Sequence, residues 1–128
     1  MKILVEEDGA RYQERTYEFA LAIVRLNRSL QGMSDMRITG NQVLRAGCSV
    51  GAHVEEAQSA HSKKDLIYRI LIALREARET HYWLRLIHDS TQVADVRPLI
   101  DEAEELKKIL GAIGSKSRGS ARSRSPAT

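Results

Sequence analysis

The chain has 128 residues, of which 42% are hydrophobic and 29% charged. That length and composition suit a single globular domain that can bury about two thirds of its unfolded surface. No stretch approaches the roughly 18 uncharged apolar residues of a transmembrane helix, so we expect no membrane span.

The net charge of +3 comes from the C-terminal end of the chain. Residues 111–128 hold four basic and no acidic side chains, whereas the other 110 residues hold 16 basic and 17 acidic ones, a net charge of −1. A folded body that binds nucleic acid by itself is usually strongly basic, and this one is not. The start, residues 1–8, turns acidic too early for a signal peptide, and Cys48 is the only cysteine. We therefore expect a cytoplasmic protein.

The first predicted helix spans residues 10–30. Its apolar residues recur at helical spacing: Tyr12, Phe19, Ile23, Leu26 and Leu30. Gly32 is expected to cap it, and residues 31–40 are expected to form a connector.

The second predicted helix begins at Thr39 or Asn41 and ends near Ser59. Gly47 and Gly51 lie four residues apart and therefore on one face. Each costs about 0.8–1 kcal/mol relative to alanine in a helix. Two such glycines on one face predict the close approach of a second helix, although two merely tolerated glycines remain the alternative.

The third, central helix is predicted from Ser62 to about residue 90. Ser62 and Asp65 have the spacing of a capping box. Between Leu66 and Leu74 only Arg69 is charged, so the apolar surface is wider than the roughly 100° stripe of an ordinary surface helix. We expect this helix to be covered on more than one side, and self-association is the simplest way to cover it.

The fourth predicted helix follows Gln92, with Asp95 or Arg97 as its cap and Pro98 in its first turn. It is expected to end at Gly111 and Gly114. Four helices with short connectors predict an all-α fold, an up-down-up-down antiparallel four-helix bundle over residues 10–112. Residues 113–128, rich in serine and arginine, are predicted to form a disordered basic tail.

No motif for catalysis, cofactor binding or metal binding is found. Di-metal bundles use Glu-x-x-His, and no glutamate of the second or central helix is followed by a histidine three residues later. His81 and His88 share a helix face, which is only a weak metal signal. Cys48, between Gly47 and Ser49, is expected to be a packing residue and not a nucleophile.

Charged residues on the second and central helices are candidates for structural ion pairs, within one subunit or between subunits. These candidates are Arg45, Glu56, Glu76 and Glu79, accompanied by Glu55, Arg75 and Arg78. Candidate contacts to nucleic acid are Lys63, Lys64, Lys116, Arg118, Arg122 and Arg124. A tail that only solubilises the protein remains an alternative.

Three stretches carry a family resemblance: LRAGCSVGAHVEEA from Leu44, SKKDL from Ser62 and ALREARETHYWL from Ala73. They resemble the bacterial four-helix bundle proteins encoded in intervening sequences of 23S ribosomal RNA genes. The matching positions are Arg45, Ser49, Val50, Gly51, Ala52, Glu56, Ser62, Asp65, Ala73, Glu76, Glu79, Trp83 and Leu84. His53 stands where asparagine is commoner.

The resemblance covers residues 10–112. It implies a ring-like homopentamer without enzyme activity. The accessory proteins of diversity-generating retroelements are similar in fold, and they bind nucleic acid and a reverse transcriptase through a strongly basic surface. The sequence therefore leads to one hypothesis, a non-enzymatic homo-oligomeric scaffold, and to an alternative, a module that binds RNA or DNA through basic residues and the tail.

Overall fold

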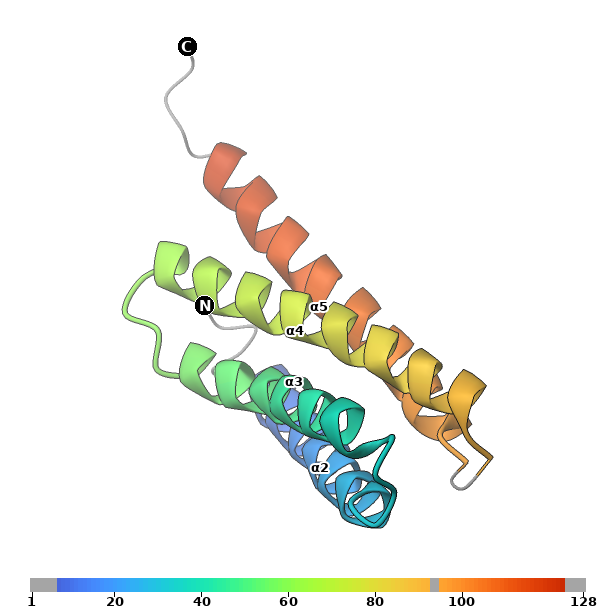
Figure 1. Ribbon diagram of the computed structural model, residues 1–128. Helices are drawn as coiled ribbons and strands as arrows, with labels where there is room; N and C mark the ends of the chain where they lie inside the picture. Colours follow the sequence, from blue (N-terminus) through green and yellow to red (C-terminus); the bar gives the residue numbers. More distant parts are fainter. Residues whose placement is uncertain (1–6, 93–94, 124–128) are drawn as a thin grey trace.

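The structure, a computed structural model, describes the backbone of residues 7–92 and 95–123 and the side chains of residues 9–92 and 95–115. Four helices follow one another: α2 (Glu7–Leu30), α3 (Arg37–Ala57), α4 (Lys63–Ser90) and α5 (Arg97–Ser123) (Figure 1). The described part of the chain contains no strand. The predicted all-α class is therefore confirmed.

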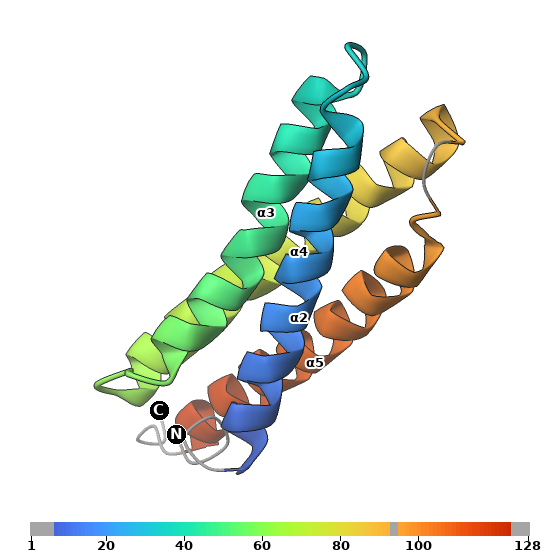
Figure 2. The ribbon, with the colours of Figure 1, turned by 90° about the horizontal axis from the view of Figure 1, so that it is seen from below.

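Each helix packs mainly against the next one in the chain. The contacts between α2 and α3, α3 and α4, and α4 and α5 are extensive, whereas α2 and α5 meet over a much smaller area. In Figure 1 the hairpin of α2 and α3 lies below the hairpin of α4 and α5, and Figure 2 shows α2 and α3 side by side along their length. This up-down arrangement of four helices confirms the predicted bundle.

One ion pair closes the bundle between its first and last helices. Arg15 donates from Nε and Nη2 to the two carboxylate oxygens of Glu102, both at 2.7 Å. This fork geometry is the strongest form of an arginine–carboxylate pair. The hydrogen bonds to Glu102 raise the pKa of Arg15 above its ordinary value.

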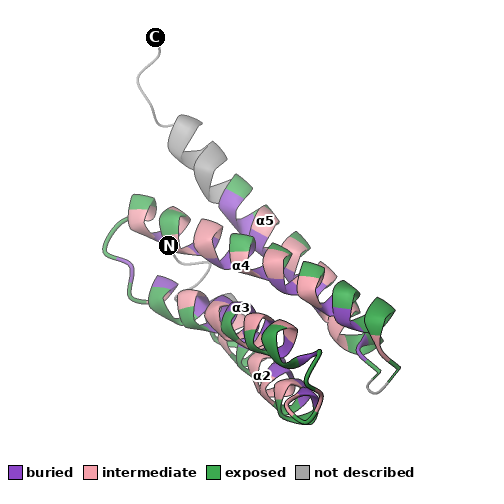
Figure 3. Ribbon diagram, in the orientation of Figure 1, coloured by how far each residue is buried: buried purple, intermediate pink, exposed green. Residues whose placement is uncertain are grey.

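The core lies where the helices face one another (Figure 3). Its largest fully buried side chains are Ile23, Leu30, Leu66, Ile70, Leu84, Ile87, Leu106, Leu110, Val43, Val50 and Val54. Burial of one such side chain contributes about 1.5–3 kcal/mol. The hydroxyls of two buried threonines form hydrogen bonds within their own helices: Thr16 donates to the backbone carbonyl of Tyr12, and Thr80 donates to that of Glu76. Neither therefore leaves an unpaired polar atom in the core.

The predicted close approach at the two glycines of α3 is confirmed, and the helix that approaches is α2 of the same chain. A Cβ on Gly47 would lie 2.9 Å from Cγ1 of Ile23, and one on Gly51 would lie 3.2 Å from the carbonyl oxygen of Thr16. This small-residue face is thus used inside the subunit.

Two helix starts differ from the prediction. α2 begins at Glu7, and α3 begins at Arg37, inside the predicted connector. Gly40 is buried in α3, where its Cβ would lie 3.4 Å from Leu30, so it permits helix packing instead of a turn. Gly32 does not have a positive φ, so it does not form a left-handed cap. The start of α4 is as predicted, because the Ser62 hydroxyl accepts a hydrogen bond from the Asp65 amide at 3.0 Å.

α5 continues past Gly111 and Gly114 to Ser123, so the predicted end of this helix was wrong. Neither glycine has a positive φ, which a left-handed cap requires. Gly114 is buried, and a Cβ there would lie 3.2 Å from Cδ2 of Leu71, so this glycine serves helix packing. Helical backbone therefore continues into the segment predicted as the tail. Residues 124–128, with Arg124, lie outside the described residues.

Candidate functional site

One side of α4 carries mostly exposed side chains, and we call it the α4 outer face: Lys64, Tyr68, Leu71, Arg75, Arg78, Tyr82 and Leu86, of which only Leu71 is half-buried and packs against the core. These residues recur every three or four positions and therefore share one face of the helix. The exposed fractions of Tyr68, Tyr82 and Leu86 are 58%, 50% and 40%. Tyrosine and arginine are the residue types enriched in protein interfaces, so this face has the composition of a contact surface.

A groove between α4 and α5 runs beside this face. Its volume is about 530 Å³, and it is lined by Leu71, Leu74, Arg75, Arg78, Gly111 and Ser115. Arg75 and Arg78 are both exposed, and neither pairs with an acidic side chain among the described residues. These two guanidinium groups remain free to meet an anionic partner.

A second hollow lies on the other hairpin, and we call it the α2–α3 groove: Gln13, Tyr17, Ala20, Cys48, Gly51, Ala52 and Glu55. Its volume is about 230 Å³. The α3 side consists mostly of small residues, while Tyr17, with an exposed fraction of 62%, stands on the α2 side. This groove was not predicted from the sequence, although the small residues at 48, 51 and 52 recur at helical spacing.

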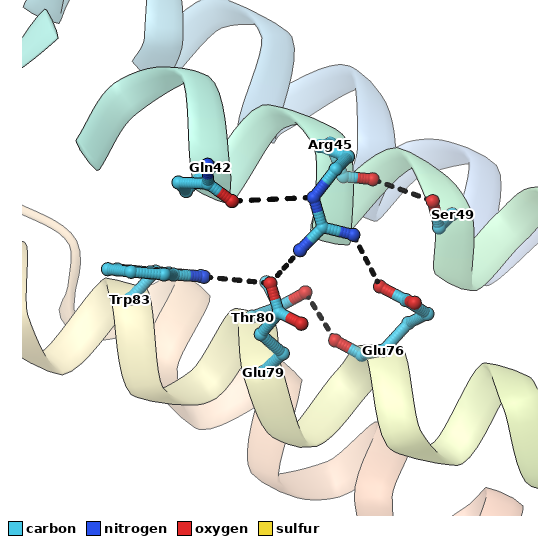
Figure 4. A network of polar contacts seen from close by, with 7 residues as sticks. All are labelled: Gln42, Arg45, Ser49, Glu76, Glu79, Thr80 and Trp83. Atoms are coloured by element: carbon cyan, nitrogen blue, oxygen red, sulfur yellow. Dashed lines mark hydrogen bonds and ion pairs between the residues drawn. The ribbon is translucent and has the colours of Figure 1, made fainter. Parts of the chain in front are cut away.

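A polar network joins α3 to α4 (Figure 4). The guanidinium of Arg45 pairs with Glu79 and, at 3.3 Å, with Glu76. Trp83 donates from Nε1 to the Glu79 carboxylate at 3.0 Å. The structure thus brings together three of the four residues named as ion-pair candidates.

The fourth candidate, Glu56, is exposed and lies outside this network. Because all the partners belong to one chain, the network links two helices of a single subunit. The carboxylates of Glu76 and Glu79 are engaged by a guanidinium and an indole, which suits a structural role.

The candidates for nucleic-acid contact lie at one end of the molecule or outside its described part. Lys63 and Lys64 are in the first turn of α4. The backbone of Lys116, Arg118 and Arg122 belongs to α5, and their side chains lie outside the described residues, as does all of Arg124.

The histidines and the cysteine are placed separately. His81 lies 3.3 Å from Glu104, which Lys107 also contacts, and burial lowers the pKa of His81 with a further contribution from Lys107. Burial raises the pKa of the Cys48 thiol, which opposes formation of the reactive thiolate. Among the described residues no three histidine, cysteine or carboxylate side chains gather as a metal site.

We expected no membrane-spanning helix. Over the described part of the chain, none of them combines the length and apolarity needed to cross a bilayer. The charged residues distributed along all four helices explain this result.

The model of a family described as 23S rRNA-intervening sequence protein matches residues 10–112. A 1.70 Å crystal structure of a protein with unknown function from the S23 ribosomal protein family of Bacteroides thetaiotaomicron VPI-5482 is 34% identical, with a TM-score of 0.74, and covers 80% of this chain and 96% of that chain. No curated protein matches the chain. The chain belongs to the 23S rRNA-intervening sequence protein family.

Proposed function

We propose that the protein is a non-enzymatic, cytoplasmic subunit of a homo-oligomeric scaffold, pentameric as the family resemblance implies. The observation that supports this proposal is the α4 outer face. Tyr68, Tyr82 and Leu86 expose large apolar groups along one line of a helix whose opposite side is fully buried. Exposed aromatic side chains interleaved with arginines have the composition of interaction surfaces.

The polar network supports the same proposal. Arg45, Glu76 and Glu79 are occupied with one another and with Trp83, and they hold α3 against α4. A rigid pair of central helices presents the α4 outer face in a fixed geometry, which lowers the entropy cost of association. The charged residues of these helices therefore act in scaffolding and not in acid–base chemistry.

Sedimentation velocity of the full-length protein across a concentration series from low to high micromolar tests the proposal. We expect a species whose mass is a multiple of the 14.4 kDa chain mass, with five copies as the specific expectation. A single species of 14.4 kDa at every concentration would reject the scaffold.

The alternative function is nucleic-acid binding through basic residues, and the length of α5 favours it. α4 and α5 run antiparallel, with Glu104 beside His81 and Gly114 beside Leu71, so the C-terminal part of α5 runs toward the end of α4 that carries Lys63 and Lys64. Basic residues of both helices thus belong to the same end of the bundle. Several tails in one oligomer would also raise the avidity for a polyanion.

A comparison of the full chain with a variant lacking residues 115–128 tests this alternative. If the alternative holds, RNA or DNA binding and its dependence on salt concentration fall together on deletion. Binding that is unchanged by the deletion excludes the tail, and the full chain's failure to bind either polymer at low salt excludes the function.

A further inference from the structure

The α4 outer face and the α2–α3 groove carry opposite charge. Exposed basic residues of α4 are Lys64, Arg75, Arg78 and Arg85. Glu55 is the charged residue that lines the groove, and Glu14 and Glu18 on α2 and Glu56 on α3 are further exposed acidic residues of the two helices that form it. Charge complementarity of this kind fixes the register of an interface and suppresses incorrect partners.

The two surfaces also complement each other in shape. The α4 outer face presents the exposed rings of Tyr68 and Tyr82, whereas the α2–α3 groove has a volume of about 230 Å³ and small side chains at Cys48 and Ala52. An aromatic ring that enters such a hollow is the usual anchor of an interface. Glu55 lines the hollow, where an arginine next to the anchoring ring can reach it.

We propose that the α4 outer face of one copy of the chain docks into the α2–α3 groove of a second copy. This inference rests on the proposed function and adds which surfaces meet. The contact is heterologous, because it joins two different patches, and a heterologous contact repeats from copy to copy until a ring closes. The occupant of each groove is thus α4 of the neighbouring copy.

A symmetric contact between two α4 outer faces is disfavoured by the same charges. It would place Arg75 and Arg78 of one copy near those of the other, and like charges at an interface oppose association. Single-stranded nucleic acid would also suit a basic face with exposed tyrosines. It would leave the acidic groove without a partner, so a second copy of this chain accounts for both surfaces.

Paired charge reversals in the full-length chain test the proposal by sedimentation. We expect Arg75→Glu with Arg78→Glu to weaken self-association about a hundredfold or more, because like charges then face each other. Glu14→Arg with Glu55→Arg should have the same effect. All four substitutions in one chain restore complementary charge and should recover the wild-type mass.

The matched control is Arg25→Glu with Arg28→Glu, which reverses two exposed arginines three residues apart on α2. It should keep the wild-type mass. Circular dichroism verifies that each variant is folded, and if a reversal unfolds the chain, the glutamine substitutions at the same positions provide the readout.

Three results would overturn the docking mode while the wild-type chain remains oligomeric. The first is an oligomer that survives reversal of Arg75 and Arg78. The second is a folded four-substitution chain that stays dissociated. The third is nucleic acid that co-purifies with the wild type but not with the Arg75/Arg78 variant, while the two proteins have the same oligomeric mass after nuclease treatment. A wild-type monomer would instead reject the proposed scaffold itself.

Discussion

At the scale of single residues, Gly47 decides how close α2 and α3 come. The side chain of Ile23 occupies the position that a β-carbon at residue 47 would need, at 2.9 Å from Cγ1. Close packing of this kind tolerates little added volume. The absence of a side chain at Gly47 therefore lets Ile23 of α2 pack directly against the backbone of α3.

We expect Gly47→Ala to lower the free energy of unfolding by up to about 2 kcal/mol. The overpacking against Ile23 costs about 1–3 kcal/mol, and the gain in helix propensity offsets only about 1 kcal/mol of it. Gly111→Ala is the control, because a β-carbon there meets nothing within 4 Å, and it should raise the free energy of unfolding by up to about 1 kcal/mol. Urea unfolding at one fixed protein concentration measures both. Equal effects of the two substitutions would contradict the packing account.

His81 gives the bundle a pH dependence with a definite sign. Its pKa is lowered from 6.5 in the folded chain, mainly by burial and then by Lys107, while Glu104 acts in the opposite direction. In the window below pH 6.5 the unfolded chain therefore binds more protons at this site, so stability falls as the pH falls. We expect the loss of unfolding free energy between pH 7.5 and 5.5 to be smaller in His81→Gln than in the wild type. If the unfolding free energies of the two proteins depend on pH in the same way, His81 does not cause the loss of stability.

At the scale of helices, the start of α4 and the C-terminal part of α5 show two different ways in which residues affect where a helix begins or ends. Ser62 begins α4 by accepting from the Asp65 amide, and the Asp65 carboxylate in turn accepts from the amide of His61 at 3.4 Å. By contrast, Gly111 and Gly114 do not stop α5, because neither adopts the left-handed conformation. A capping side chain is a local chemical signal, whereas a glycine ends a helix only when its backbone turns.

We expect Ser62→Ala to destabilise the bundle by about 1 kcal/mol, the typical cost of a lost N-cap. Ser59→Ala is the matched control, since Ser59 is exposed in the turn after α3 and no capping bond is formed by its hydroxyl. Thermal unfolding of both variants provides the comparison. A melting temperature of the Ser62 variant equal to that of the control would show that the cap contributes nothing.

Much of this architecture could be predicted from local patterns. Helical spacing of apolar residues located all four helices, and the Ser62–Asp65 spacing located the start of α4. The partner of the Gly47 and Gly51 face could not be predicted, because a small-residue face is equally suited to a neighbour in the same chain or in another. The α2–α3 groove was missed for a related reason: it is formed by two helices together, and neither sequence segment shows it alone.

At the scale of the whole molecule, the bundle is an open succession of helices. α2 and α5 touch over a small area, and the Arg15–Glu102 pair links them. The two surfaces that we pair lie on different hairpins, with the α4 outer face on one and the α2–α3 groove on the other. A subunit with two unlike and complementary surfaces is suited to a cyclic assembly.

The single native cysteine allows the most direct measurement of this account. Cys48 lines the α2–α3 groove, so a cysteine placed at position 68, 75 or 82 of the α4 outer face should oxidise with Cys48 of a neighbouring copy. Because a disulfide requires Cα atoms about 4.4–6.8 Å apart, at least one of Tyr68→Cys, Arg75→Cys and Tyr82→Cys should give a ladder of covalent oligomers in non-reducing electrophoresis. The ladder should disappear when Cys48→Ala is added. An oligomeric protein that forms no such ladder, or one whose ladder persists without Cys48, would contradict the pairing of these two surfaces.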